Sequence, residues 1–419
     1  MNILLVTRGS QGDVYPYLGL GTALMKQGHT ITLSLPRLFE RHAQDAGIPY
    51  VLQAFDDIAG MVEGKPDTKA LLEWTNRVIQ SQFEELPPLL DKHDLLIAAN
   101  TEFAAPSVAE WCGKPIFRTA YGPFIPGKKI PPPVMPWLKP KPWIPPALLW
   151  KALNAGLNLM CRKTLNTHRA ARNMPLIADQ GEHAPANAVN YLMYSSFLGE
   201  IDPQWKYRWA IGGYCFNDNL PYNQGLLDEL LAFIKKDDKP TIFFTLGSCN
   251  AAQRDKFAQK LFAICRERGY KLVVGCGWWK VGSHLHKEGN LFLLDQVIPH
   301  CRVFPFCDAI IHHGGSGTTH SAARAGKPQM VAPLLIDQHY WGQRVTGLGL
   351  GPSSIRITIS KGALEGKIRD LLDNPAYKTN ASTLGEKIRA ERGIENFLEY
   401  IAAPPGGTPG GKPVGRSPV

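Results

Sequence analysis

Residues 312–319 read His-His-Gly-Gly-Ser-Gly-Thr-Thr, a combination of side chains that can bind a diphosphate. The apolar run Ala309–Ile311 just before them indicates a buried strand, and the small residues from Thr318 to Ala325 indicate a helix. A glycine-rich turn between a strand and a helix directs free backbone N–H groups and the positive end of the helix dipole toward one point, where an anion binds. The sequence therefore predicts an anion-binding turn here.

Several residues of this turn could contact a phosphate directly. Gly315 and Gly317 lack a Cβ atom, so the backbone can approach a phosphate closely. Thr318 and Thr319 place hydroxyl groups near the start of the helix, and His313 can donate a ring N–H to the same oxygens. A tight turn that needs glycines only for its shape is the simpler interpretation. The combination of histidine, glycine and threonine favours a site that stabilises the negative charge on a departing diphosphate.

Strand and helix signals alternate along the chain, which is typical of parallel sheets covered by helices on both faces. In the first half the predicted strands are Ile3–Thr7, Thr30–Leu35, Tyr50–Gln53, Asp94–Ala99 and Ile116–Tyr121, and the predicted helices are Tyr15–Gln27, Lys69–Glu85, Ala105–Cys112 and Ala147–Asn173. In the second half the predicted strands are Thr241–Ser248, Lys271–Gly275, Leu291–Leu294, Ala309–His312 and Gln329–Pro333, and the predicted helices are Gln253–Arg268, Thr318–Ala325 and Ile394–Ile401. The sequence therefore predicts an α/β protein with two similar domains.

The two series of elements meet near residues 207–224, which we interpret as a linker. This divides the chain into an N-terminal domain (1–206) and a C-terminal domain (225–401). Residues 402–419 are rich in proline and glycine, which predicts a disordered tail. The segment Gly122–Pro146 contains ten prolines and interrupts the alternation, and long irregular connections of this kind are often functional or disordered.

The bulk composition indicates a globular cytoplasmic protein. The chain has 419 residues, of which 44% are hydrophobic, enough for two domains with a core each. The first residues contain only a short apolar run, so no signal peptide is expected, and no apolar stretch reaches the roughly 18–20 residues of a membrane-spanning helix. The eight cysteines form no Cys-x-x-Cys pair, which favours reduced thiols over disulfides or a zinc site.

The net charge of +10 is concentrated in one segment. Between Gly127 and Arg172 there is no acidic residue, and the basic residues there are Lys128, Lys129, Lys139, Lys141, Lys151, Arg162, Lys163, Arg169 and Arg172. No known nucleic-acid-binding motif accompanies them, so we expect no nucleic-acid partner. A solvated basic face and a surface that touches an anionic membrane are the two interpretations that stay open.

Motifs at both ends of the chain resemble those of family 1 glycosyltransferases. The turn is followed by Gly326-Lys327-Pro328-Gln329-Met330-Val331-Ala332-Pro333, then by Asp337-Gln338-His339-Tyr340-Trp341-Gly342-Gln343, and by Gly349-Leu350-Gly351-Pro352. With Pro305 these residues closely resemble the donor-binding signature of the family, in particular that of the sterol glucosyltransferase and antibiotic glycosyltransferase branch. Near the N-terminus, Gly9–Leu20 is similar to the opening of that branch and to that of bacterial rhamnosyltransferases that act on lipids.

The resemblance implies a GT-B fold, in which two Rossmann-like domains face each other across a cleft and the C-terminal domain binds the nucleotide sugar. It also implies a donor site made of Ser248, Val297, Ile298, His313, Gly315, Gly317, Thr318, Asp337 and Gln338. Asp337 and Gln338 match the pair that holds the sugar hydroxyls, although an ordinary loop or helix cap would use the same residues. Ser248 matches a phosphate or sugar contact, although a turn serine is nearly as plausible.

The base-binding part of the donor site departs from the family pattern. Val297 and Ile298 stand where the uracil ring is held, and plant relatives carry an aromatic residue near Val297. Ser321 stands where many relatives carry a glutamate for the ribose hydroxyls. The choice between uridine and thymidine diphosphate therefore stays open, with UDP-glucose favoured.

Asp13 is the candidate catalytic base, because members of this branch carry an aspartate at this position. A carboxylate there could take the proton of the acceptor hydroxyl as its oxygen attacks the anomeric carbon. Alternatively, Asp13 caps the helix that begins near Tyr15, and both roles can hold together. His313 is the second residue to which we assign a catalytic role.

No metal or other cofactor is expected. Many metal-using glycosyltransferases bind Mn²⁺ or Mg²⁺ through Asp-x-Asp, which does not occur in this sequence. His284 and His286 form a His-x-His pair, which without further ligands nearby is typical of a solvated loop. The nucleotide sugar would be a co-substrate.

The N-terminal domain should bind the acceptor. Phe124, Met135, Trp137 and Trp143 lie among lysines in the proline-rich segment and favour a lipophilic acceptor such as a sterol, polyketide, flavonoid or hydroxy-lipid. A rigid proline-rich cover over the domain is an equally good interpretation.

An inverting, UDP-sugar-dependent hexosyltransferase is therefore the predicted function, with a lipid rhamnosyltransferase that uses dTDP-rhamnose as the alternative. A binding subunit without catalysis and a nucleotide-sugar epimerase of the same fold are less consistent with these motifs.

Overall fold

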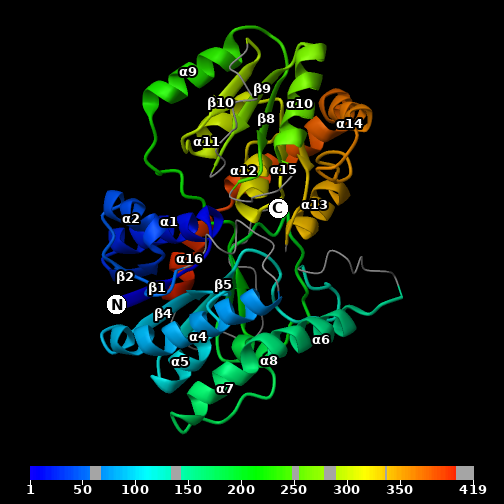
Figure 1. The fold of residues 1–419 in the computed structure, drawn as a ribbon. Helices are drawn as coiled ribbons and strands as arrows, with labels where there is room; N and C mark the ends of the chain where they lie inside the picture. The colour runs from blue at the N-terminus through cyan, green and yellow to red at the C-terminus, as the bar shows by residue number, and fades with distance from the viewer. Residues whose placement is uncertain (57–67, 134–142, 248–253, 278–288, 336, 403–419) are drawn as a thin grey trace. The chain divides into compact units, whose positions relative to one another are not determined.

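The computed structural model describes residues 1–56, 68–133, 143–247, 254–277, 289–335 and 337–402. These residues form two compact units (Figure 1). The first contains Met1–Ser196, Glu200–Asn217 and the segment that begins at Arg392, and the second contains Phe197–Gly199 and Asp218–Glu391. Met135, Trp137, Ser248, His284 and His286, for which the sequence made predictions, lie outside the described residues.

The first unit is built on a parallel sheet in the order β3-β2-β1-β4-β5-β6-β7. Its strands are β1 (Asn2–Val6), β2 (Thr30–Leu35), β3 (Tyr50–Leu52), β4 (Leu95–Ala99), β5 (Ile116–Ala120), β6 (Val189–Leu192) and β7 (Trp209–Ile211). Its helices are α1 (Gln11–Lys26), the 3₁₀ turn η1 (Arg37–Phe39), α2 (Glu40–Asp45), α4 (Thr68–Leu90), α5 (Ala105–Trp111), α6 (Pro146–Leu157), the π-helical turn η2 (Asn158–Arg162), α7 (Lys163–Ala170), α8 (Gln180–Ala186) and α16 (Gly393–Ala402).

Helices cover both faces of this sheet. Successive residues of a strand point to opposite faces, so the apolar strand residues need a covering layer on each side. On one face, Leu4 and Val6 of β1 belong to a buried cluster with apolar residues of α4, α5, η2 and α7. On the other face, α1 approaches so closely that a Cβ atom on Gly21 would lie 3.3 Å from Leu5 Cδ1. The first unit thus has three layers, with the sheet between two layers of helices that bury its apolar side chains.

The second unit is built on a parallel sheet in the order β10-β9-β8-β11-β12. Its strands are β8 (Thr241–Thr245), β9 (Lys271–Gly275), β10 (Leu291–Leu294), β11 (Ala309–His312) and β12 (Gln329–Val331). Its helices are α9 (Gln224–Lys235), α10 (Arg254–Arg268), α11 (His300–Val303), the 3₁₀ turn η3 (Phe304–Phe306), α12 (Ser316–Arg324), α13 (Gln338–Gly347), α14 (Lys361–Asp373) and α15 (Pro375–Ala390).

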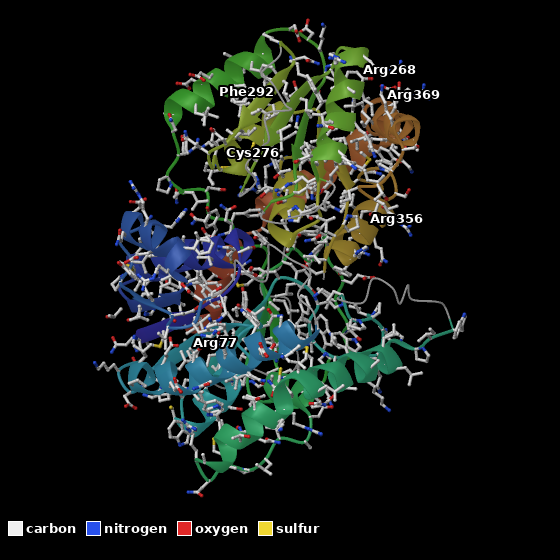
Figure 2. The ribbon with its side chains drawn as sticks, in the orientation of Figure 1. Arg77, Arg268, Cys276, Phe292, Arg356 and Arg369 are labelled. Carbon is white, nitrogen blue, oxygen red and sulfur yellow. The ribbon has the colours of Figure 1, made fainter. Side chains whose placement is uncertain are left out.

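Neighbouring residues of β8 show how this sheet divides the second core. Phe243 packs in a cluster with residues of α9 and α12, whereas Phe244 packs in a second cluster with residues of α10 and α14. On the α9 side, the ring centroid of Phe292 (labelled in Figure 2) lies 5.5 Å from that of Phe233. The predicted α/β class with two parallel sheets is confirmed.

The structure corrects the predicted domain boundaries in two places. Residues 209–211, predicted to lie in a linker, form β7 and pair with β6 at the edge of the first sheet. Helix α16, predicted to close the C-terminal domain, belongs to the first unit because its apolar side chains pack there. The ring centroid of Phe397 lies 4.4 Å from that of Tyr191 on β6, and Asn396 donates a hydrogen bond of 2.7 Å to the Gly212 carbonyl.

Candidate active site

The glycine-rich turn connects β11 to α12 as the sequence predicts, with the helix beginning two residues earlier, at Ser316. Gly314 has φ +93°, and a Cβ atom there would lie 2.6 Å from Val331 Cγ1, so this position requires glycine. The first helical N–H bond runs from Thr319 to the Gly315 carbonyl (3.0 Å). The N–H groups of Gly317 and Thr318 therefore have no acceptor within the helix and are available to an anion.

His312 is a structural residue of this turn. Its Nε2 donates to Gln329 Oε1 (2.9 Å), and its Nδ1 accepts from the Gly314 N–H (3.0 Å). Burial lowers the pKa of His312 to about 4, so the ring stays neutral. The two hydrogen bonds use both ring nitrogens, and His312 is thereby committed to holding the shape of the turn.

His313 is different, because one of its ring nitrogens has no partner. The side chain is 8% exposed, and no group of the described residues lies within hydrogen-bonding distance of Nδ1. A Cβ atom on Gly247 would lie 2.8 Å from the His313 Cε1 atom, and one on Gly315 would collide with Nε2. The ring is thus wedged between two glycines at the carboxyl ends of β8 and β11.

Burial sets the protonation state of His313. It lowers the pKa of His313 to about 3, and the neighbouring imidazoles of His312 and His300 lower it further, while the Thr245 carbonyl acts weakly in the opposite direction. The ring is therefore neutral at physiological pH and has a single N–H. In one tautomer this N–H bonds the Thr245 carbonyl, and in the other it lies on Nδ1, where it can be donated to a ligand oxygen. A buried nitrogen without a partner costs free energy that a ligand oxygen could recover.

The two threonines of the turn have different roles. Thr319 is fully buried, and its hydroxyl donates to the Gly315 carbonyl (2.9 Å), so the prediction that it faces a phosphate is wrong. Helical geometry explains the difference, since a threonine hydroxyl readily bonds the carbonyl four residues earlier. Thr318 precedes it in the first turn, and Gly315 and Gly317 are partly exposed beside it.

Asp337 and Gln338 follow β12 at the same sheet edge and organise their own loop. Gln338 Oε1 accepts hydrogen bonds from the N–H groups of Leu334 (2.8 Å) and Leu335 (3.0 Å). Asp337 Oδ2 accepts from Trp341 Nε1 (3.0 Å), and Trp341 is a core residue, as predicted. These bonds fix both side chains next to the turn, and their contact with a sugar stays a prediction.

The residues predicted to hold the base differ in exposure. Ile298 is 5% exposed and packs in the core cluster with Phe304 and Ile310, and its contact with the base stays a prediction. Val297 is 37% exposed beside it and stays a candidate.

Asp13 lies in the first turn of α1, in the first unit. Its Oδ2 accepts from the Ser10 N–H (2.8 Å) and from the Ser10 hydroxyl (3.3 Å). The Asp13 carbonyl accepts from the hydroxyls of Thr7 (3.1 Å) and Tyr121 (3.0 Å). The helix begins at Gln11, earlier than predicted, and its N-cap is Ser10. Asp13 supports this cap from the third helical position and is not the cap itself.

The capping contacts do not make Asp13 a strong acid. Burial raises its pKa from 3.8 to about 6, although the bonds from Ser10 act in the opposite direction. Gly9 has φ +133°, and a Cβ atom there would collide with the Asp13 carboxylate. Asp13 is thus held in place, ionised at neutral pH and basic enough to take a proton.

A buried polar cluster near Asp13 was missed by sequence reasoning. Arg8 Nε lies 3.7 Å from Glu102 Oε2, Arg8 Nη1 donates to the Phe55 carbonyl, and Gln82 donates to the Glu102 carboxylate. Burial raises the pKa of Glu102, and the Arg8 charge counteracts it. The one available signal was that Arg8 and Glu102 follow β1 and β4, which are neighbours in the sheet.

The predicted acceptor residues are only partly described. Phe124 is half-buried and Trp143 is 72% exposed, and no contact between them supports a common site.

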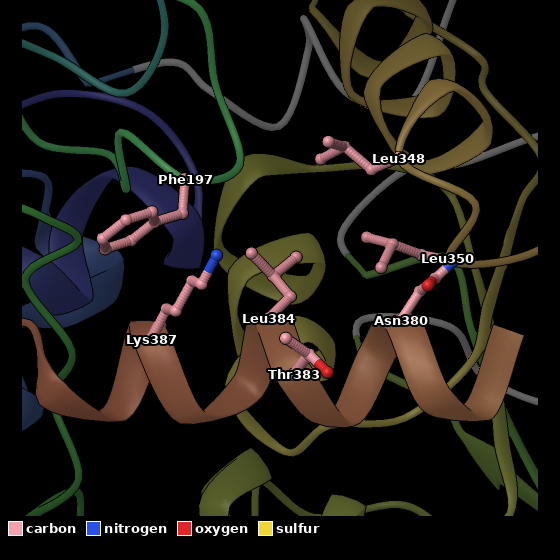
Figure 3. A pocket seen from close by; sticks show the side chains of 7 residues that line it. All are labelled: Phe197, Leu348, Leu350, Asn380, Thr383, Leu384 and Lys387. Atoms are coloured by element: carbon pink, nitrogen blue, oxygen red, sulfur yellow. The ribbon is translucent and has the colours of Figure 1, made fainter. Parts of the chain in front are cut away.

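A cavity of about 260 Å³ opens in the second unit (Figure 3). It is lined by Phe197, Leu348, Leu350, Asn380, Thr383, Leu384 and Lys387. These residues come from α15, the segment after α13 and the stretch 197–199, and none of them belongs to the predicted donor site. This cavity is therefore not the predicted donor site.

The packing around His313 predicts that Gly315→Ala weakens nucleotide binding. The added methyl group would displace the ring and the adjacent N–H groups, and UDP should then protect the variant from thermal unfolding far less than it protects the parent. Gly366→Ala, in a helix where a Cβ atom meets nothing within 4 Å, is the matched control. Equal protection of both variants would contradict the assigned geometry.

The raised pKa of Asp13 predicts that Asp13→Asn stabilises the protein near neutral pH. Between the unfolded pKa of 3.8 and the folded pKa of about 6, the folded protein holds a proton that the unfolded chain releases, so the parent loses stability as pH rises through this range. Above it the variant should be more stable by on the order of 1–3 kcal/mol. Urea unfolding of both proteins at pH 4 and pH 7 measures this, and a difference independent of pH would refute it.

Comparison with known proteins places these features in a family. The model of the glycosyltransferase family 28 N-terminal domain matches residues 3–128, and that of the erythromycin biosynthesis protein CIII-like C-terminal domain matches residues 286–394. A sterol 3-beta-glucosyltransferase of Arabidopsis thaliana is 27% identical over 95% of this chain, which spans 65% of that protein's length. The vancomycin aglycone glucosyltransferase of Amycolatopsis orientalis is 29% identical over 84% of this chain and 85% of its own.

Solved structures show the same architecture. The calicheamicin glycosyltransferase CalG4 superposes with a TM-score of 0.72 at 18% identity, over 96% of this chain and 97% of its own. The predicted fold is thereby confirmed. The chain therefore carries a glycosyltransferase family 28 N-terminal domain over residues 3–128 and an erythromycin biosynthesis protein CIII-like C-terminal domain over residues 286–394, on a GT-B fold.

Proposed function

We propose that the protein is an inverting glycosyltransferase that moves glucose from UDP-glucose to a hydroxyl group of a lipophilic acceptor. The observation that carries this proposal is the neutral, buried His313 with an unpartnered ring nitrogen, beside the free N–H groups at the start of α12. This arrangement supplies hydrogen-bond donors without water, at a point where a diphosphate gains negative charge.

The proposed reaction is a single displacement. Asp13 removes the proton of the acceptor hydroxyl, and the oxygen attacks the anomeric carbon from the face opposite the diphosphate, which inverts the configuration. The bond between the anomeric carbon and the phosphate oxygen breaks, and UDP leaves with the electron pair. The His313 ring and the N–H groups of Gly317 and Thr318 stabilise the charge on the leaving group. The partly exposed Asp337 is a candidate to orient the sugar.

Two observations support the proposed acceptor class: the acceptors for which similar proteins are named, and the apolar and basic composition of part of the first unit. Proteins similar to this chain are named for sterols and for antibiotic aglycones such as that of vancomycin. We propose an acceptor of this lipophilic kind: a sterol, polyketide, flavonoid or hydroxy-lipid. Such acceptors concentrate in membranes, so the proposal includes peripheral contact between the protein and an anionic membrane surface.

His313→Ala should remove most of the protection that UDP-glucose gives against thermal unfolding. A hydrogen bond to a charged phosphate contributes about 1.5–3 kcal/mol, which corresponds to roughly tenfold to hundredfold weaker binding. His313→Asn, which places an amide nitrogen near the position of Nδ1, should retain part of the protection. His29→Ala, a partly exposed histidine of the first unit, is the control. Parent-like protection and turnover in His313→Ala would remove the basis of the proposal.

A lipid rhamnosyltransferase that uses dTDP-rhamnose is the alternative, motivated by Gly9–Leu20 and the proline-rich segment. The two functions differ in the nucleotide bound. We expect UDP-glucose to raise the melting temperature more than dTDP-rhamnose does at equal concentrations, since the stabilisation follows the ratio of ligand concentration to Kd. The reverse order would favour the alternative.

A further inference from the structure

One exposed face of the first unit has an unusual composition. Helix α6, the π-helical turn η2 and α7 form a continuous helical segment, residues 146–170, shown in green in Figure 1. Its buried side carries Leu149, Trp150, Cys161 and Leu165. Its exposed side carries Leu148, Lys151, Ala152, Ala155, Leu159, Arg162 and Lys163, which follow one another at helical spacing. We call these seven residues the basic-apolar face.

Large apolar side chains of this face lie in solvent. Leu148 is 54% exposed and Leu159 is 83% exposed, eleven residues apart and therefore in nearly the same direction from the helix axis. Trp143, just before α6, and Leu176, in the loop after α7, are also strongly exposed. A helix that only covers a sheet would carry polar residues at such positions, so these side chains need another explanation.

The basic side chains of this face lack carboxylate partners among the described residues. Within the described part of the chain, no carboxylate lies within ion-pair distance of Lys151, Arg162 or Lys163, although Arg162 Nη1 donates to the Ala178 carbonyl (3.1 Å). By contrast, the buried Arg169 of α7 pairs with Glu110 at 2.8 Å. No aspartate or glutamate occurs anywhere from Trp111 to Ala178. The face is therefore apolar and positive with no compensating negative charge nearby in the sequence.

We propose that the basic-apolar face docks on the surface of a bilayer that contains anionic lipid. The lysines and arginine would lie at the headgroups, and Leu148 and Leu159 would enter the boundary between headgroups and acyl chains. Charge complementarity favours this occupant over a protein partner, because a positive face with isolated leucines suits a diffuse negative surface. Among the described residues, no helix combines the length and the apolar content that a membrane span requires.

This inference deepens the proposed function and rests on its lipophilic acceptor, which a membrane-bound enzyme would meet at the bilayer surface. It specifies which helix makes the contact and in which orientation. The two ideas can fail separately, because vesicle binding requires neither donor nor catalysis.

Vesicle co-flotation of the full chain tests the inference. We expect binding to vesicles of phosphatidylcholine with one quarter phosphatidylserine, little binding to pure phosphatidylcholine, and release at high salt. Each basic residue at such a surface contributes roughly a fivefold change in partitioning. Lys151→Glu with Lys163→Glu should therefore reduce binding by at least about 25-fold, and Leu148→Ser with Leu159→Ser should reduce it without changing the net charge.

The matched control is Lys256→Glu with Lys378→Glu, which makes the same charge change at exposed lysines of the second unit. It should bind as the parent does, and all variants should keep the melting temperature and the protection by UDP. The inference is overturned if the parent ignores anionic vesicles, if the control loses as much binding as the face variant, or if the face variant binds normally. Loss of vesicle binding with intact UDP protection shows that the donor site and the membrane face are separate.

Discussion

The second unit depends on keeping an imidazole uncharged in a buried position. His313 is enclosed by glycine backbone at two strand ends. If both of its nitrogens were protonated, the positive ring would lie next to the rings of His312 and His300, and no carboxylate is among the groups that shift its pKa. Burial therefore keeps the ring neutral. The positive potential of the turn then comes from N–H dipoles and from the helix start. Such dipoles are already oriented, so they need no rearrangement when negative charge develops on a leaving group.

Asp13 illustrates the opposite requirement, since a base must be able to lose and regain its proton. Two hydrogen bonds from Ser10 favour the carboxylate, while burial favours the acid, and burial prevails to bring the pKa to about 6. The capping role and the proposed catalytic role use the same geometry. Capping fixes the carboxylate at the carboxyl edge of the sheet, and a fixed base reacts without first being ordered.

Much of this arrangement was predictable from local sequence, and the failures share one cause. Strands β9, β10 and β11 have the predicted bounds, because short apolar runs flanked by turn residues have few alternatives. The packing of α16 in the first unit and the membership of β7 in the first sheet are decided by contacts with residues far away in sequence. The Thr319 hydroxyl was misassigned because the start of α12 was predicted two residues late. The pairing of Arg8 with Glu102 likewise depends on which strands become neighbours.

The two proposed substrates differ in their solubility in water, and each unit would have a surface suited to one of them. A nucleotide sugar is charged and strongly hydrated, so a site that replaces water by fixed N–H groups, as the turn at His313 does, can hold it without exposed apolar surface. A lipophilic acceptor is scarce in water and abundant in membranes, so the unit that carries Asp13 gains from a surface that stays at the bilayer. Leu148 and Leu159, together with the basic residues of the same face, Lys151, Arg162 and Lys163, would give that unit such a surface. Within the proposed face, the absence of acidic residues meets the same requirement, because a carboxylate there would repel the lipid headgroups.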